Sequence, residues 1–309
     1  MAAKENSLRS GLRNHRGSHG GREDFAGWLY VLPAFLPLLV FWIVPVIHSF
    51  VISFTDWDLV SKKINFMALR NYLALLRDPK FFRVLLNTLV FAAGSTVPTI
   101  VLGLFVALLL SGRVRRGRGL FRTLIFSPYV TPMVAVSIVW SWIFEPRVGV
   151  LNYLLSLVGV PALKWTGSMD TAMLSVIIVT VWKQLGWTMI FYLEAINRVP
   201  KQLLEAATMD GVGFCRRLLR VILPMISPTS YFLVIISTIT SIQAYDQILV
   251  LTGGGPAGAT RTILYYYYQE AFNSFAAGRA SAVAVFIVII TVALSAAETA
   301  LSKRAVYYD

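Results

Sequence analysis

Six long blocks of apolar residues constrain this chain more than any other feature of its sequence. They run over about 28–52, 88–110, 123–144, 173–196, 231–251 and 280–301. Each block approaches or exceeds the roughly 20 residues that cross a bilayer as a helix. Hydrophobic residues make up 57% of the 309 and charged residues only 14%, a balance too apolar for a soluble domain of this length. The sequence therefore predicts an all-α, polytopic membrane protein with six transmembrane helices.

The distribution of positive charge predicts how the chain crosses the membrane. Most of the 28 lysines and arginines lie in the N-terminal stretch, in the loops after the second and fourth blocks, and at the C-terminal end. Cytoplasmic segments of membrane proteins are enriched in these residues, so both termini are expected in the cytoplasm. The same rule accounts for the net charge of +13 without a nucleic-acid partner. The segment 71–86 holds several basic residues on the outer side, and its pattern favours an amphipathic helix on the membrane surface.

Composition also divides the chain. Residues 1–24 are rich in Gly, Ser, Arg and His, so we expect a mobile basic cytoplasmic tail. Residues 25–309 are expected to form one membrane domain, because no loop is long enough to fold as a second, soluble domain. The single cysteine, Cys215, excludes an internal disulfide.

The loop 197–228 carries more pattern than the other connections. Its sequence is NRVPKQLLEAATMDGVGFCRRLLRVILPMISP, in which 202–209 is good helix and Gly211 and Gly213 interrupt it. A second short helix is expected over 214–221, before Pro224 and Pro228 lead into the fifth block. The sequence thus predicts two short helices that join at a glycine turn and project from the cytoplasmic face.

This loop resembles the EAA loop of binding-protein-dependent ABC importers. The matching residues are Glu205, Ala206, Ala207, Asp210 and Gly211, followed by Ile222, Leu223 and Pro224. Three further segments resemble the same family: 71–88, 149–155 and the LTGGGP run at 251–256, the last being similar to the maltose and glycerol-3-phosphate permease type. In such a loop, small alanines let the helix enter a cleft while Glu205 offers a carboxylate to a basic partner residue.

The resemblance implies the transmembrane domain of a type I ABC importer, with a five-helix core and an extra first helix. It implies a heterodimer with a second homologous permease, two ATPase subunits inside and an extracytoplasmic solute-binding protein outside. Alternating access would carry a carbohydrate through the cytoplasmic membrane, coupled to the ATPases through the Glu205 loop. The chain contains no G-x-x-x-x-G-K-[ST] motif, so ATP hydrolysis is expected from the partner subunits. The chain itself is expected to be a translocation subunit with no enzyme activity, no metal and no cofactor. A self-sufficient secondary transporter or channel is the alternative, and it predicts an internal repeat or a membrane-embedded acid relay.

Polar residues inside the spans are the candidates for contacts with the solute. Lys183 lies near the middle of the fourth block, where an unpaired ammonium costs at least about 2.5 kcal/mol. Three roles stay open for it: contact with the solute, a structural ion pair or polar contact, or extension to an interface. Contact would favour an anionic solute such as a glycerol phosphate, whereas an ion pair with Asp246 would leave a neutral sugar site.

The carbohydrate permeases that the chain resembles bind solute along the fourth span and the end of the fifth. Carried over by position, this implies solute contacts at Trp182, Leu185, Gly186, Met189, Thr240, Ser241, Gln243 and Ala244, with the polar group continuing through Asp246. Aromatic rings stack on the CH faces of sugars, and amides and hydroxyls exchange hydrogen bonds with sugar hydroxyls.

Overall fold

The computed structural model describes residues 30–112 and 117–305, and most of these residues are helical. Within these ranges the extended backbone pairs once, in an isolated bridge between Thr55 and Phe66. The all-α prediction is therefore confirmed. The chain forms two compact units, Met1–Val51 and Ile52–Asp309. The basic tail expected at 1–24 lies outside the described residues.

The first unit contributes one helical stretch. It runs from Tyr30 to Ile52, contains the π-turn η1 (Leu39–Ile43) and ends in α3 (Val44–Ile52). Its 23 residues have a mean hydropathy of 2.3, which is long and apolar enough to cross a bilayer. This stretch matches the first predicted block.

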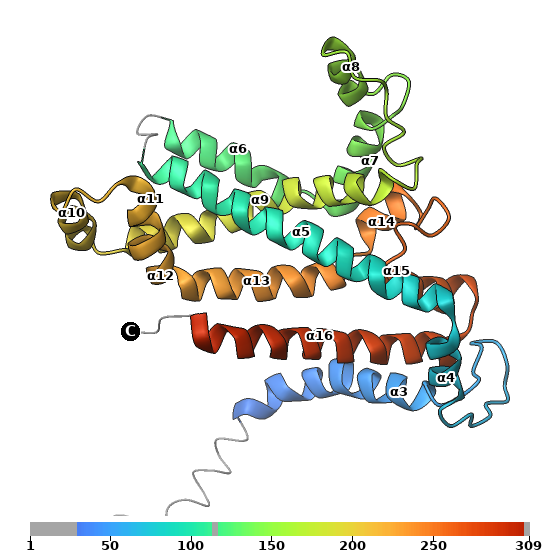
Figure 1. The fold of residues 1–309 in the computed structure, drawn as a ribbon. Helices are drawn as coiled ribbons and strands as arrows, with labels where there is room; N and C mark the ends of the chain where they lie inside the picture. The colour runs from blue at the N-terminus through green and yellow to red at the C-terminus, as the bar shows by residue number, and fades with distance from the viewer. Residues whose placement is uncertain (1–29, 113–116, 306–309) are drawn as a thin grey trace, which may run out of the picture. The chain divides into compact units, whose positions relative to one another are not determined.

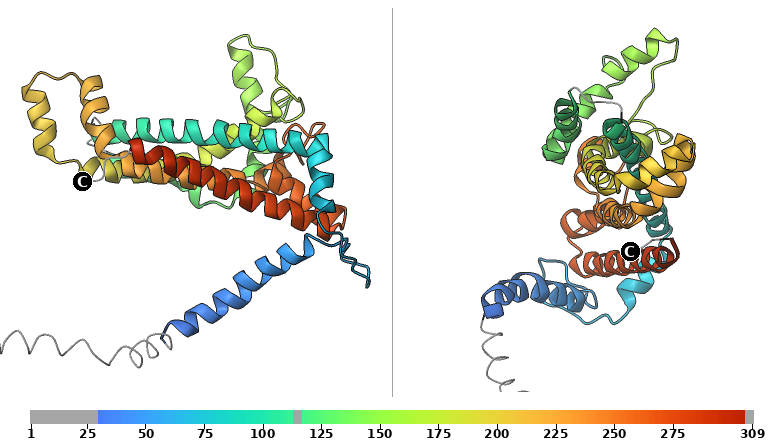
Figure 2. Two further views of the ribbon diagram at one scale, coloured as in Figure 1. Left: turned by 60° about the horizontal axis from the view of Figure 1, so that its bottom comes forward. Right: turned by 90° about the vertical axis from the view of Figure 1, so that its left-hand side faces the viewer.

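Long helices form the frame of the second unit: α5 (Pro79–Gly112), α9 (Ala172–Arg198), α13 (Ser227–Ile242) and α16 (Ala277–Ala305). Helix α5 packs along both α9 and α13, and α13 packs against α16 (Figure 1). Figure 2 shows the same helices running lengthwise side by side. α5, α9 and α16 contain the second, fourth and sixth predicted blocks and satisfy the length and hydropathy of a membrane span.

The amphipathic segment expected at 71–86 is not one continuous helix, because the chain breaks within it. Helix α4 (Arg70–Arg77) ends before Asp78, whose carboxylate accepts a hydrogen bond from Lys80 N at 2.9 Å. Pro79 then opens α5, since proline suits a first helical position. Leu75 and Phe81 are fully buried against α15 and α16, whereas Leu73, Leu76 and Phe82 are exposed.

Two predicted spans are bent. The third is divided between α6 (Arg118–Val130) and α7 (Met133–Ile143), which meet at 101°. Thr131 and Pro132 both take extended backbone, and a residue before proline is disfavoured in helical conformation. The fifth block ends as a helix at Ile242 and resumes as α14 (Asp246–Leu251). A separate bend of 71° lies between Phe214–Met225 and Ser227–Ile242. The described residues hold four single-helix candidate spans, or six when the two bent pairs, α6 with α7 and 214–225 with 227–242, are each counted as one span.

Short helices gather at the two ends of the second unit (Figure 1). One end carries α10 (Lys201–Met209), α11 (Phe214–Arg217), η2 (Leu218–Ile222) and α12 (Leu223–Met225). The opposite end carries α4, α14, α15 (Ile263–Tyr268) and η3 (Gln269–Asn273), with α8 (Val150–Leu157) projecting beside them. Below, these are called the α10 end and the α14 end.

Candidate functional site

A polar cavity of about 310 Å³ lies where α9 passes the breaks in the third and fifth spans. Helix α9 contributes Thr180, Lys183 and Gln184, and the broken third span contributes Tyr129 and Met133. The remaining lining residues come from the fifth span and its break: Thr240, Gln243, Ala244, Tyr245, Asp246 and Gln247. Amides, hydroxyls and two charged groups thus line a hollow within an otherwise apolar bundle.

Lys183 is held by the broken end of α6. Its Nζ donates to the carbonyl oxygen of Tyr129 at 2.8 Å and to that of Pro128 at 3.4 Å. It also lies 5.4 Å from the centroid of the Tyr129 ring. The last carbonyls of a helix have no partners within the helix and carry partial negative charge, so a lysine there satisfies and stabilises them. Hydrogen bonds to a charged group contribute about 1.5–3 kcal/mol.

One face of α9 packs against the end of α6. Positions 183, 186 and 187 share this face, because residues three and four apart align on a helix. A Cβ at Gly186 would lie 2.6 Å from Cα of Phe126, so only glycine lets the α6 backbone approach this closely. The ring of Trp187 stacks on Tyr129, with 6.1 Å between centroids. Lys183 and Gly186 therefore both position the third span.

The structure divides the residues that were predicted to contact solute. Lys183, Thr240, Gln243, Ala244 and Asp246 line the cavity. The other five do not line it: Trp182, Leu185, Gly186, Met189 and Ser241.

Three residues of this second group make contacts elsewhere in the helix bundle. Met189 is fully buried in the apolar cluster between α5 and α9, and the hydroxyls of Ser241 and Ser95 lie 2.9 Å apart between α13 and α5. Trp182 packs edge-on against Trp140, with 5.4 Å between ring centroids.

Cavity residues from the third span were missed in the sequence. Tyr129 and Met133 flank the break at Thr131 and Pro132, and the break turns them toward α9. Pro128 and Pro132 within one apolar block are a visible signal, because proline interrupts or bends a helix. Pro128 itself lies inside α6, so the prolines alone do not show which of them marks the bend.

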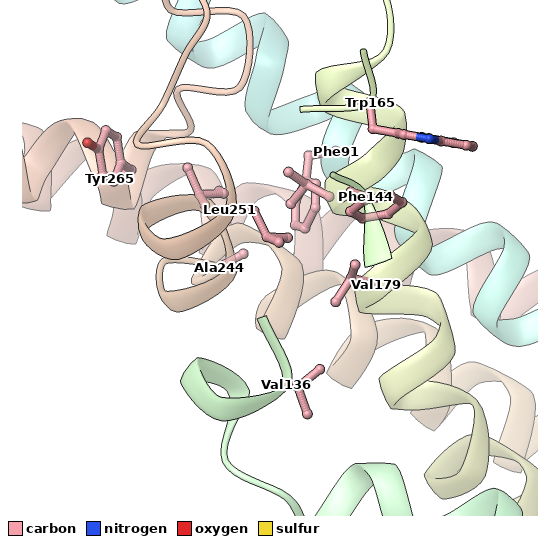
Figure 3. Packing of buried hydrophobic residues seen from close by; sticks show 10 residues of the cluster. Phe91, Val136, Phe144, Trp165, Val179, Ala244, Leu251 and Tyr265 are labelled. Carbon is pink, nitrogen blue, oxygen red and sulfur yellow. The ribbon is translucent and has the colours of Figure 1, made fainter. Parts of the chain in front are cut away.

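The wall of the cavity toward the α14 end is rigid and aromatic. Gln247 is 7% exposed and its amide reaches the Thr180 hydroxyl at 3.5 Å. The ring of Tyr245 packs on Tyr268 and Tyr265, with centroid distances of 4.9 and 6.2 Å. Tyr245 also packs against an apolar cluster that includes Phe91, Val179, Ala244 and Leu251 (Figure 3). This packing fixes the break between α13 and α14 that opens the cavity.

At the α10 end, two short helices form a projecting unit, the α10–α11 pair. Gly211 has a φ of +70°, and the amides of Gly211 and Val212 donate to the carbonyls of Thr208 and Ala207 at 3.0 Å each. This is a Schellman ending, which favours glycine at the left-handed position. Arg217 then ties the second helix to the first through the Thr208 hydroxyl at 2.9 Å.

The five predicted coupling residues lie together on this pair. Glu205, Ala206, Asp210 and Gly211 are exposed, whereas Ala207 is buried on the inner side. Within the described residues, the Glu205 carboxylate has no ion-pair partner. Met209 is 88% exposed beside them. The pair therefore presents two exposed carboxylates, those of Glu205 and Asp210, among small and apolar residues.

A bundle of apolar helices with a central polar cavity and a free helix pair at one end defines a membrane transport subunit. Residues 99–307 match the family of binding-protein-dependent transport system inner membrane components. The chain is 34% identical to the probable ABC transporter permease protein YurN of Bacillus subtilis (strain 168), over 87% of this chain and 92% of that protein. This chain belongs to the binding-protein-dependent transport system inner membrane component family.

Other similar proteins agree on class and fold. The chain is 31% identical to the sn-glycerol-3-phosphate transport system permease protein UgpA of Agrobacterium fabrum, over 91% of this chain and 96% of that protein. A chain in the crystal structure of a bacterial ABC transporter involved in the import of the acidic polysaccharide alginate superimposes with a TM-score of 0.79 at 22% identity. That match covers 92% of this chain and 96% of the other. The fold is thus that of an ABC importer transmembrane domain, as predicted.

Proposed function

We propose that this chain is the permease subunit of an ATP-driven importer that moves a carbohydrate across the cytoplasmic membrane by alternating access. The observation that carries the proposal is the cavity between α9 and the breaks in the third and fifth spans. Its lining of amides, hydroxyls and tyrosine suits a hydroxylated solute. The names of relatives support the same class, since one group serves sn-glycerol 3-phosphate and a structural neighbour imports alginate.

The proposal gives the chain three kinds of partner. A second homologous permease completes the pathway, two ATPase subunits bind ATP and dock on the α10 end, and a solute-binding protein docks at the α14 end. A structural neighbour was crystallised with a pentasaccharide-bound periplasmic protein, which supports the last of these. In this arrangement the α10 end and both termini face the cytoplasm. The proposal requires no catalytic residue, cofactor or metal in the permease itself.

Coupling in this proposal runs through Glu205. The carboxylate is exposed and unpaired within the described residues, so it offers a partner for a basic ATPase residue. Ala206, Asp210 and Gly211 border it and leave room for a close approach. Removing one partner of a buried, hydrogen-bonded charge pair costs about 2 kcal/mol or more once the interface has closed.

A double variant, Glu205→Arg with Gly211→Pro, tests the coupling role. We expect at least about a tenfold loss of solute-stimulated ATP hydrolysis in the reconstituted importer, because the charge is reversed and the helix ending is distorted. Asp170→Arg is the matched control, since it makes the same charge change at an exposed acid outside the α10–α11 pair. Normal stimulation and normal co-purification of the ATPase subunits with the double variant would refute the coupling proposal.

A further inference from the structure

Two charged side chains of opposite sign line the cavity. Of the lining residues, Lys183 and Asp246 are the two that carry a formal charge at neutral pH. They do not form an ion pair, because the ion pairs of the described residues are Arg198 with Glu194 and Arg279 with both Asp78 and Glu270. The two charged groups therefore have different partners.

The ammonium of Lys183 already donates hydrogen bonds within the protein. Its contacts are the carbonyl oxygens of Tyr129 and Pro128 and the face of the Tyr129 ring. All three are electron-rich, and the carbonyls belong to the negative end of α6. A solute that recruited this cation would compete with the contacts that hold the bent third span in place.

The polar groups that remain free in the wall suit hydroxyls. Asp246 is exposed, and its carboxylate has no hydrogen-bond or ion-pair partner among the described residues. The same holds for the side-chain amides of Gln184 and Gln243, which line the cavity beside it. A carboxylate accepts two or more hydroxyl hydrogen bonds, whereas it repels a phosphate or a second carboxylate.

We propose that this cavity takes an uncharged, polyhydroxylated solute and discriminates against sugar phosphates and sugar acids. Asp246 and the amides of Gln184 and Gln243 hydrogen-bond its hydroxyls, while Lys183 is a positioning residue for the third span. The inference rests on the proposed carbohydrate transport and narrows it. It separates this chain from relatives named for sn-glycerol 3-phosphate and from the neighbour that imports an acidic polysaccharide.

Direct binding to the importer complex tests the inference. The complex, in lipid nanodiscs and without its binding protein, is titrated with maltose, trehalose and sucrose, each beside its monophosphate, and with sn-glycerol 3-phosphate. We expect at least one neutral sugar to bind roughly tenfold or more tightly than its phosphate, because the unpaired carboxylate of Asp246 repels the phosphate. Tighter or equal binding of the phosphates would overturn the inference and leave the carbohydrate function standing. Binding of none of the probes would overturn both.

Charge variants identify the residues responsible. Asp246→Asn is expected to reduce the difference in affinity between a sugar and its phosphate. Asp170→Asn is expected to leave this difference unchanged, because Asp170 is an exposed acid that does not line the cavity. Lys183→Met is expected to weaken the neutral sugars as well as the phosphates, and Lys183→Arg to restore them, because arginine also donates to helix carbonyls. Loss of the phosphates with unchanged binding of the neutral sugars in Lys183→Met would show that Lys183 acts on the solute and not on the third span, and would overturn the assignment.

Discussion

The cavity and the α10–α11 pair both interrupt an apolar chain with polar residues, but they are held together in opposite ways. The pair closes on itself, through backbone bonds within 206–212 and one bond from Arg217 to Thr208. The cavity depends on residues far apart in sequence, such as Lys183 with Tyr129 and Ser95 with Ser241. A local change should therefore stay local in the pair, whereas in the cavity it should move a whole helix.

The largest effect is expected from Gly186→Ala. The added Cβ would overlap the α6 backbone at Ile125 and Phe126. Backbone atoms cannot move aside as the end of a flexible side chain can. Overpacking of this kind costs about 1–3 kcal/mol, and the displaced α6 would also lose the bond from Lys183 to Tyr129. We expect a lower melting temperature of the purified importer and a loss of transport of at least about tenfold.

Gly119→Ala is the control for this change. Gly119 also lies in a helix, α6, but a Cβ there would meet no atom within 4 Å. Replacement of an exposed helical glycine by alanine stabilises by about 0.5–1 kcal/mol. Equal melting temperatures and transport for the two variants would show that α6 does not rest on Gly186.

A smaller effect is expected in the α10–α11 pair from Gly211→Ala. The φ of +70° at this position costs a residue with a Cβ about 1–2 kcal/mol. The amides of Gly211 and Val212 should then exchange faster with solvent, and solute-stimulated ATP hydrolysis should fall about fivefold or more. The melting temperature of the whole importer should change little, because the ending is local.

The neighbouring glycine provides the matched control. Gly213 has a φ of −61° and a ψ of 158°, an extended conformation that any residue adopts, and a Cβ there meets nothing within 4 Å. Gly213→Ala should therefore leave both exchange and coupling unchanged. If Gly211→Ala lowered the melting temperature as much as Gly186→Ala, the contrast between a local and a long-range site would be wrong.

The sequence predicts local features of the α10–α11 pair better than the long-range contacts around the cavity. The two short helices and their glycine turn were predictable, because composition and Gly211 act within one turn of chain. Five of the ten proposed solute contacts line the cavity, since position along a span is also local information. The contacts of Lys183, the close approach at Gly186 and the place of Tyr129 were not predictable, because each depends on where another helix bends. The burial of Leu75 and Phe81 within 71–86 was missed for the same reason, since these side chains meet α15 and α16.

The smallest effect concerns a third long-range contact, at the α14 end. Arg279 Nη2 donates to the Tyr266 hydroxyl at 2.6 Å and to Asp78 at 2.8 Å, which ties α15, α16 and the start of α5 together. Burial raises the pKa of Tyr266 from 10.0 to about 12. Between these values the unfolded chain releases the phenol proton and the folded chain keeps it, so stability falls as pH rises from about 10 to about 12.

Tyr266→Phe removes this titration. The variant should be slightly less stable than the parent at pH 8, because the bond from Arg279 is lost, and its stability should fall less steeply between pH 10 and pH 12. Chemical unfolding of the purified importer across this range measures both slopes. A parallel fall for Tyr266→Phe and the parent would mean that this buried phenol does not contribute to holding the α14 end, and long-range contacts would then matter chiefly around the cavity.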